Sequence, residues 1–438
     1  MNKLEKYSAY KDSGVEWLGE IPEHWNIVRL GTLGNFTASG IDKYIINSES
    51  LVKIINFTDI YSRTNLTLDS KINYMEVTTP ELNRKKHLVK KGDLIFLPSS
   101  ETFEDLGLSA LVNEELDNTS FSYHVIRLEF KKDIEHNFRK YLSNNNFVLN
   151  QFSSYGKGTT RKIIGRNIFK NVRVLIPPKQ EQIKIAKFLD TKTQQLDIAI
   201  KQKEQLIELL KERRQIIIND AVTKGIDKTV AMKDSGVEWI GEIPEGWEVK
   251  KNKYIFFEVD ERSKDGKEEL LSVSHMTGVT PRSEKNVNMF MAEDYTGSKT
   301  CSKDDLVINI MWAWMGAMGI SDRIGIVSSS YGIYRQITKD TLNTRYLEYL
   351  LKTNKYIEEY NKRSTGLHAS RLRLYSDMFF DMKIGFPNYK EQQKIVNYIE
   401  ENNNKIDKAI DLQQQQIIKL KEYKSTLIEA IVTGKVRI

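Results

Sequence analysis

The sequence predicts an α+β fold built as a tandem repeat, in which two globular α/β regions are separated by two long antiparallel coiled-coil helices with pseudo-two-fold symmetry. Three observations lead to this prediction. A fifteen-residue segment occurs twice, and a second segment recurs ahead of each predicted helix. Apolar residues then return every seven positions, which is typical of a coiled-coil seam.

The repeat has similar ends and a divergent middle. Residues 11–25 return as 233–247 with thirteen of fifteen positions identical, and 177–185 returns as 387–395 around a shared Glu-Gln-x-Lys-Ile. Between these anchors only fragments match: 91–95 with 303–307, and 124–127 with 332–335. The divergent middles indicate two readers with different targets, or duplicated loops that diverged without functional meaning.

Each long helix is predicted from an uninterrupted apolar pattern. No glycine or proline lies between Glu181 and about Val222, and Gly225 and Gly434 follow the two patterns as C-terminal stops. The linker after Gly225 is short, so the second helix buries its seam only by returning antiparallel to the first, which predicts a dumbbell. The seam rows are Leu189, Leu196, Lys203, Leu210 and Ile217, then Ile399, Ile406, Gln413, Leu420 and Leu427. Lys203 and Gln413 stand third in their rows, so they either meet and fix the register or are solvated defects.

Four segments follow from these patterns. The predicted divisions are 1–175 with its strap 11–25, a helical spacer 176–230, then 231–385 with the repeated strap 233–247, and a second spacer 386–438. Strands are expected at 51–55, 94–97, 124–130, 306–310 and 333–337, and helices at 137–147 and 344–363. Trp17, Trp25, Trp239 and Trp247 are interpreted as structural straps.

Composition restricts the class of protein. The 438 residues are 40% hydrophobic, and no stretch approaches the roughly 20 apolar residues of a membrane helix. The N-terminus has no signal-peptide core, and the single Cys301 excludes an internal disulfide, so we expect a cytoplasmic protein with no membrane partner. The net charge of +7 suits a polyanion, or reflects drift in a chain rich in lysine and asparagine.

No catalytic motif is found. The sequence lacks a Gly-x-x-x-x-Gly-Lys phosphate loop, a Gly-x-Gly-x-x-Gly segment after a strand, and the Asn-Pro-Pro-Phe type of signature of amino-methyltransferases. Its six histidines never take the close spacing of a zinc helix. A turn before a strand explains Asp93 and Asp305 as well as a nuclease site would. We expect no catalytic centre, metal or cofactor in this chain.

Candidate DNA contacts lie ahead of each long helix. Arginine suits guanine edges and phosphates, and serine and threonine suit phosphate oxygens. Two glycine-containing basic segments supply Lys157, Thr159, Thr160, Arg161 and Lys162, then His368, Ser370, Arg371 and Arg373. Plain solvated loops are the alternative. Trp312 and Trp314 are candidates for apolar contact with bases, although two tryptophans on one strand face more often belong to a core.

Taken together, the repeated segments resemble those of a known family, the specificity subunits of type I restriction–modification systems. Three features carry the resemblance across the whole chain: the straps at 14–25 and 236–247, the Pro-x-x-x-Glu-Gln-x-Lys-Ile segments, and the endings at 221–225 and 431–435. In that family, two variable target-recognition domains each read one half of a bipartite DNA sequence, held apart by two antiparallel helices. The resemblance therefore implies a non-catalytic DNA-recognition subunit.

The resemblance also implies partners. Besides double-stranded DNA, these are two methyltransferase subunits, which carry S-adenosylmethionine, methylate adenine at N6 and dock on the helical spacer residues named above. Restriction subunits that use ATP and Mg²⁺ join them in a bacterial cytoplasmic complex. The alternatives are a coiled-coil interaction scaffold with no DNA role and, more weakly, a single-chain nuclease–methyltransferase.

Overall fold

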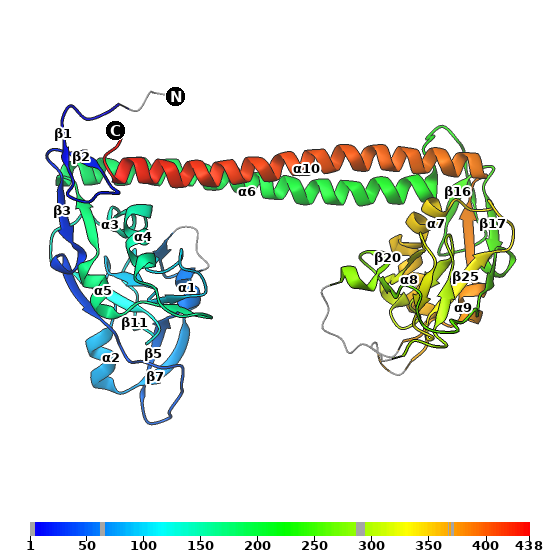
Figure 1. The fold of residues 1–438 in the computed structure, drawn as a ribbon, viewed down its shortest axis with the longest axis horizontal. Coiled ribbons are helices and arrows are strands. Elements are labelled where there is room, and N and C mark those ends of the chain that lie inside the picture. Colours follow the sequence, from blue (N-terminus) through cyan, green and yellow to red (C-terminus); the bar gives the residue numbers. More distant parts are fainter. Residues whose placement is uncertain (1–4, 62–65, 286–293, 367, 369–371) are drawn as a thin grey trace. The chain divides into compact units, whose positions relative to one another are not determined.

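The structure, a computed structural model, describes residues 5–61, 66–285, 294–366, 368 and 372–438 (Figure 1). The chain forms two compact units. Unit 1 comprises Met1–Glu204 and Gln414–Ile438, and unit 2 comprises Gln205–Gln413. Each unit combines a mixed α/β region with parts of two long helices, α6 (Lys179–Lys224) and α10 (Tyr389–Val432). The predicted α+β class with two long helices is confirmed.

Unit 1 contains a five-stranded sheet in the order β4-β12-β8-β10-β6 and a three-stranded sheet β11-β5-β7. Its strands are β1 (Tyr10–Asp12), β2 (Glu20–Pro22), β3 (Asn26–Arg29), β4 (Gly34–Thr37), β5 (Ser50–Ile55), β6 (Thr67–Leu68), β7 (Met75–Thr79), β8 (Leu94–Phe96), β9 (Ser99–Ser100), β10 (Ser109–Val112), β11 (Thr119–Phe121), β12 (Ile126–Phe130), β13 (Lys162–Ile163) and β14 (Arg173–Ile176). Its short helices are α1 (Phe57–Tyr61), α2 (Glu81–His87), α3 (Arg139–Ser143), α4 (Asn146–Ser154) and α5 (Arg166–Asn171), with a 3-10 turn η1 (Leu30–Thr32).

Unit 2 contains a four-stranded sheet in the order β18-β25-β22-β23. Its strands are β15 (Met232–Asp234), β16 (Glu242–Pro244), β17 (Glu248–Lys251), β18 (Phe256–Glu258), β19 (Leu271–Ser274), β20 (Gly278–Pro281), β21 (Lys299–Cys301), β22 (Leu306–Ile308), β23 (Met318–Ile320), β24 (Gly325–Val327), β25 (Gly332–Gln336) and β26 (Lys383–Phe386). Its helices are α7 (Thr344–Leu351), α8 (Asn354–Arg363) and α9 (Ser376–Asp381), with 3-10 turns η2 (Asn252–Tyr254), η3 (Arg282–Glu284) and η4 (Ala313–Met315).

The central strands β8 and β22 explain why both sheets are buried on two faces. Side chains alternate across a strand. Leu94 and Phe96 therefore join one core of unit 1, while Ile95 joins a second core on the opposite face. In unit 2 the buried Val307 likewise faces away from its neighbours on β22 and joins a separate cluster. A continuous apolar run thus forms a strand with two buried faces.

The long helices complete the core of each unit. In unit 1 the beginning of α6 packs with the end of α10, where Leu189 and Ile431 are fully buried. In unit 2 the end of α6 packs with the beginning of α10, through Val222 and Ile399. Within each unit the two helices lie side by side and antiparallel (Figure 1).

Polar contacts along the helices confirm this direction. In unit 1, Lys424 Nζ donates to Asp197 Oδ1 at 2.6 Å, and Lys203 Nζ donates to Gln416. In unit 2, Arg214 pairs with Asp407. Lys203 thus has a partner one helical turn beyond Gln413, while the pairing of Lys203 with Gln413 itself stays a prediction. Both helices end as expected before glycines in the left-handed conformation, Gly225 (φ +76°) and Gly434 (φ +73°).

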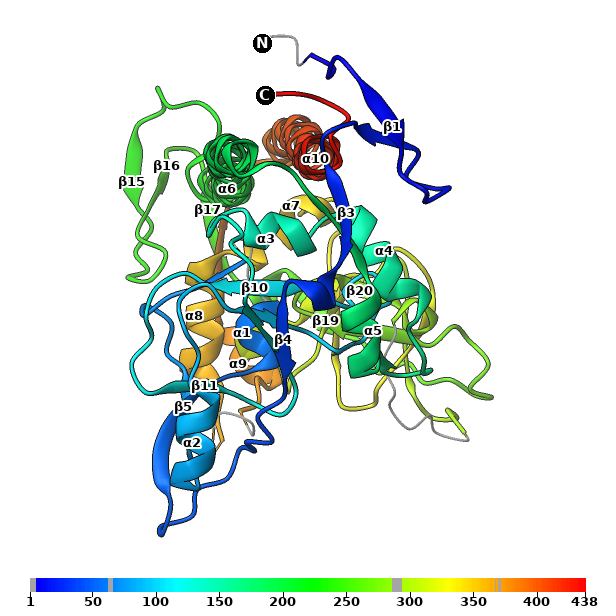
Figure 2. The same ribbon diagram turned by 90° about the vertical axis from the view of Figure 1, so that its left-hand side faces the viewer.

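The recurring Glu-Gln pair ties each helix to the strap before it. Trp25 Nε1 donates to Glu181 Oε2 at 2.9 Å, and Trp247 Nε1 donates to Glu391 Oε1 at 3.1 Å. The following glutamine, Gln182 or Gln392, is buried and donates to the carbonyl of the proline five residues earlier. In unit 1 the segment before β1 also pairs with the segment after α10, at a backbone bridge between Glu5 and Arg437; Figure 2 shows β1 near the end of α10.

Several details differ from the sequence-based expectations. The run 137–147 forms the end-to-end pair α3 and α4, and 344–363 is divided into α7 and α8 at Lys352 and Thr353. Trp25 and Trp247 are buried, but Trp17 is 56% exposed and lies against Phe147. The predicted divisions after residues 175 and 385 separate helices from globular regions, whereas the compact units each include helical parts, so these divisions stay a prediction.

Candidate nucleic-acid interface

The two matched fragments in the middle of each repeat form an ion pair between adjacent strands. In unit 2, Arg335 on β25 donates from Nε to Asp305 Oδ1 at 2.7 Å and from Nη2 to Oδ2 at 2.9 Å. Asp305 also accepts from the backbone N–H of Ser302 at 2.8 Å. The aspartate therefore closes the turn before β22, as expected, and anchors the neighbouring strand.

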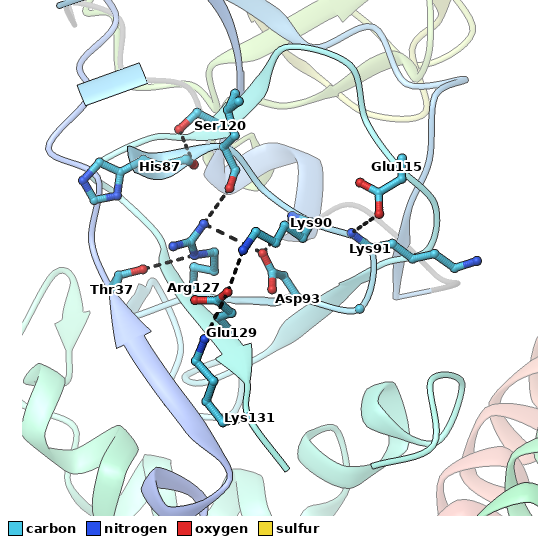
Figure 3. Close-up of polar contacts among 12 residues, drawn as sticks. Thr37, His87, Lys90, Lys91, Asp93, Glu115, Ser120, Arg127, Glu129 and Lys131 are labelled. Carbon is cyan, nitrogen blue, oxygen red and sulfur yellow. Dashed lines mark hydrogen bonds and ion pairs between the residues drawn. The ribbon is translucent and has the colours of Figure 1, made fainter. Parts of the chain in front are cut away.

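Unit 1 repeats this pair in a looser form (Figure 3). Asp93 accepts from the backbone N–H of Lys90 at 2.9 Å, but Arg127 Nη1 lies 3.9 Å from Asp93 Oδ2 and instead donates to the Leu88 carbonyl at 2.7 Å. Burial raises the pKa of Asp93 to about 6. Arg127 Nε donates to Thr37 at 3.2 Å. In both units this aspartate and arginine lie between two adjacent strands and have a structural role.

A groove of about 620 Å³ lies beside Arg127. Its lining carries both signs of charge: Lys85, Lys86, Lys90 and Arg127 alongside Glu115, Asp117 and Glu129. Lys90 is already paired with Glu129 at 2.9 Å. The acidic side chains therefore offset most of the positive charge along this groove.

The predicted basic segment of unit 1 forms a hairpin. The backbones of Lys157 and Ile163 exchange hydrogen bonds of 3.1 and 2.8 Å, and β13 pairs with β9. Lys157, Thr159, Thr160 and Arg161 are exposed, and Lys162 is half-buried over the ring of Phe103 at 4.9 Å. All five predicted residues are thus brought together on one turn.

The corresponding segment of unit 2 has the same frame. Thr365 and Arg373 exchange backbone hydrogen bonds of 3.0 and 2.9 Å. His368 is exposed, and Arg373 is half-buried, with Nη1 donating to the adjacent Leu372 carbonyl at 2.9 Å. The predicted Ser370 and Arg371 lie outside the described residues.

Each hairpin is attached to the loop that follows the central strand of its unit. Ile164 N donates to the Pro98 carbonyl at 2.9 Å in unit 1, and Leu374 N donates to the Ile310 carbonyl at 3.1 Å in unit 2. In unit 1 the hairpin and this loop therefore form one surface, and in unit 2 the described ends of the segment lie against the corresponding loop. The side chains on the two loops differ, which is where the repeat diverges.

The tryptophans of unit 2 lie on this loop, but not on a strand as expected. Trp312 precedes the 3-10 turn η4 and Trp314 lies within it, because Asn309 ends β22 by accepting from the backbone N–H of Met311 at 3.2 Å. Their rings stack at 5.9 Å, and Trp312 is 46% exposed. Trp312 is therefore a surface residue and not part of the core.

Three residues that no motif indicated position Arg161 of unit 1. Ser99 accepts from Arg161 Nε at 3.1 Å, the Phe57 ring lies 5.2 Å from its guanidinium, and Tyr61 stacks on Phe57 at 5.2 Å. They come from β9 and α1, far apart in sequence. A sequence pattern does not indicate such contacts, because they depend on how the strands are ordered.

The ten predicted seam residues all lie on α6 or α10. Leu189, Ile399, Ile406 and Leu427 are buried and the other six are half-buried. The exposed apolar side chains on the helices include Ile198 in unit 1 and Leu206, Leu209, Ile216 and Leu412 in unit 2. In unit 2 a groove of about 480 Å³ is lined by Leu209, Ile216 and Tyr398. Docking of other subunits on the helices stays a prediction.

Two absences hold for the described part of the chain. Its histidine, cysteine and acidic side chains form no group of three that could hold a metal ion. None of its helices is long and apolar enough to cross a membrane.

Comparison with known proteins gives a consistent result. Residues 22–209 match the family model described as the type I restriction modification DNA specificity domain. The chain is similar to the type I restriction enzyme MjaVIII specificity subunit of Methanocaldococcus jannaschii, with 23% identity over 441 residues, 95% of this chain and 94% of the relative. It is also 24% identical to the putative MjaX specificity subunit of the same organism, over 96% of each chain.

Two solved structures share the fold. One, from work on complex assembly and conformational transition of the type I R-M system, has a TM-score of 0.68 with 16% identity and covers 95% of this chain and 99% of its own. The other, the HsdS subunit from Thermoanaerobacter tengcongensis, has a TM-score of 0.56 with 16% identity, and covers 95% and 98%. At this identity the likeness concerns the fold.

Proposed function

We infer that this chain, which belongs to the family of type I restriction–modification DNA specificity subunits, recognises DNA sequence and that units 1 and 2 each read one half of a bipartite target. The main observation behind this proposal is that the same arrangement of segment and loop occurs in both units. Each unit attaches a hairpin to the loop after its central strand, and the two loops present different side chains. A shared frame with different side chains suits two readers of different half-sites.

The chemistry of the two surfaces supports DNA contact. Unit 1 presents exposed cationic and hydroxyl side chains at 157–161, which suit phosphates and base edges. Unit 2 presents the exposed indole of Trp312 beside its hairpin, which suits apolar contact with a thymine methyl group. The net charge of +7 adds sequence-independent attraction to DNA.

The partners follow from the same role. Two methyltransferase subunits that carry S-adenosylmethionine would dock on α6 and α10 and methylate adenine at N6, and restriction subunits that use ATP and Mg²⁺ would cut unmodified DNA in the bacterial cytoplasm. Exposed leucine and isoleucine side chains on both helices support such docking. This chain would contribute recognition and no catalytic group, cofactor or metal.

The test is sequencing of methylated adenines in a host that expresses this chain with its methyltransferase, compared with the methyltransferase alone. We expect a bipartite motif with an unspecified gap only when this chain is present. Exchanging 248–385 for the corresponding region of another specificity subunit should change one half-site, and exchanging 26–175 should change the other. A stable complex that yields no motif, or one exchange that alters both halves, would contradict the proposal.

A further inference from the structure

We propose that Arg161 specifies a guanine in the half-site read by unit 1, its guanidinium being held by Ser99 and Phe57 as an oriented two-pronged donor. The inference rests on the proposed function and adds the base that one residue reads. It concerns unit 1 alone.

The position of the guanidinium is fixed on two sides. Nε donates to Ser99 Oγ at 3.1 Å, and Ser99 is itself buried on β9. The guanidinium carbon lies 5.2 Å from the centre of the Phe57 ring, which is stacked on Tyr61. With Nε engaged by Ser99 and the guanidinium carbon over the Phe57 ring, the two Nη groups are left to donate to a ligand. The Arg161 side chain is exposed, and among the described residues neither Nη has a hydrogen-bond partner.

The hairpin that carries Arg161 is also constrained. Gly158 has φ +117°, and a Cβ at this position would lie 2.1 Å from the Arg161 carbonyl oxygen, so the backbone approach requires glycine. Lys157 and Ile163 close the hairpin through two backbone hydrogen bonds, and Lys162 donates to the carbonyl of Thr159 inside the turn. A fixed backbone and a fixed Nε together orient the donor pair before DNA arrives.

The surroundings favour a base edge over a phosphate. The adjoining loop carries Glu101 and Glu104, which are exposed, and these carboxylates repel a phosphate but accept a hydrogen bond from cytosine N4. Phe103 and Tyr155 are 39% and 54% exposed and give the surface an apolar character. A phosphate contact needs only positive charge, whereas an oriented fork matches the O6 and N7 acceptors of guanine in the major groove.

The test uses the full chain with its methyltransferase and duplexes that carry the motif found by methylation sequencing. Arg161→Ala should relax one guanine position of the unit 1 half-site, and the purified complex should lose roughly 5- to 150-fold in discrimination at that position. Arg161→Lys, which keeps the charge but not the fork, should relax the same position while keeping more of the total affinity. In the unchanged protein, 7-deazaguanine at that position should weaken binding by roughly 5-fold, because it lacks the N7 acceptor.

The matched control is Arg29→Ala, which removes an exposed arginine of β3 in the same unit and should leave the motif unchanged. The decisive result is non-additivity: 7-deazaguanine should cost nothing further once Arg161 is alanine. If Arg161→Ala instead weakens binding to all sequences equally, and the slope of log affinity against log salt concentration falls in magnitude by about 1, Arg161 contacts a phosphate and the inference is wrong. An unaltered motif would also overturn the inference. If the unchanged complex shows no sequence preference at all, the proposed function fails as well, which separates the two failures.

Discussion

Replacing Arg335 by methionine should strongly destabilise unit 2. Arg335 gives Asp305 two hydrogen bonds, at 2.7 and 2.9 Å, and the Asp305 side chain is only 1% exposed. After the substitution the buried carboxylate keeps one donor, the backbone N–H of Ser302. Removing one partner of a buried pair costs about 3–5 kcal/mol, because the remaining charge is left uncompensated.

Replacing the aspartate of the pair instead of the arginine should lower the free energy of unfolding by less. In Asp305→Asn the arginine side chain remains 33% exposed to water and keeps Glu261 at 3.1 Å, so we expect roughly 1–2 kcal/mol. The double variant Arg335→Met with Asp305→Leu should be more stable than Arg335→Met alone, because no charge is left buried. This ordering separates the cost of an orphaned charge from the loss of packing.

Native-state hydrogen exchange on the full chain is the suitable assay, because the two compact units can open separately. Peptides that cover β22 and β25 should lose protection in Arg335→Met, while peptides from unit 1 serve as the internal control. If Arg335→Met changes the opening free energy by less than about 1 kcal/mol, or the double variant is less stable than the single one, the reasoning about the buried charge is wrong.

Two further predictions concern unit 1 and the helix ends. Because burial raises the pKa of Asp93 to about 6, above its unfolded value near ~3.9, the folded state binds this proton more tightly and stability is lost as pH rises through about 6. Asp93→Asn removes that loss, so the unfolding free energy of the variant relative to the unchanged protein should rise by about 2–3 kcal/mol between pH 4 and pH 8 in urea titrations; a pH-independent difference would refute the assignment. Gly434→Ala should lower the thermal midpoint of unfolding more than Gly225→Ala. Both glycines have a positive φ, so both substitutions strain the backbone. At Gly434 the new Cβ would also lie 2.3 Å from Pro22, whereas at Gly225 the atom nearest to the new Cβ would be 3.6 Å away. Calorimetry of the two variants checks this, and equal shifts would show that backbone conformation alone matters.

The sequence was most informative where one local pattern determines the structure. The heptad rows, the Pro177-Pro178 boundary and Gly225 predicted a helix whose observed limits are Lys179–Lys224. The segment around Trp312 was misleading, since its alternation of large apolar residues fits a strand equally well. The side chain of Asn309 ends the strand and starts a turn, and an asparagine at that point was the signal available in the sequence.

Contacts between strands were beyond local patterns. The fragments around Asp93 and Arg127 match their counterparts in the second repeat, but their pairing requires β12 to lie beside β8. The positions of Ser99 and Phe57 beside Arg161 depend in the same way on two separate elements. Composition therefore indicates the two basic segments, whereas the residues that orient them follow only from strand order.

The discontinuity of unit 1 has a consequence for biosynthesis. Unit 2 is one continuous stretch, 205–413, whereas unit 1 needs 414–438 to complete its core through Leu427, Ile431 and Val432. On the ribosome the nascent chain can therefore finish unit 2 first, while the earlier-made unit 1 waits with an apolar surface uncovered. This inverts the usual N-terminal-first order of domain folding, because the earlier-made unit 1 depends on residues that are made after unit 2.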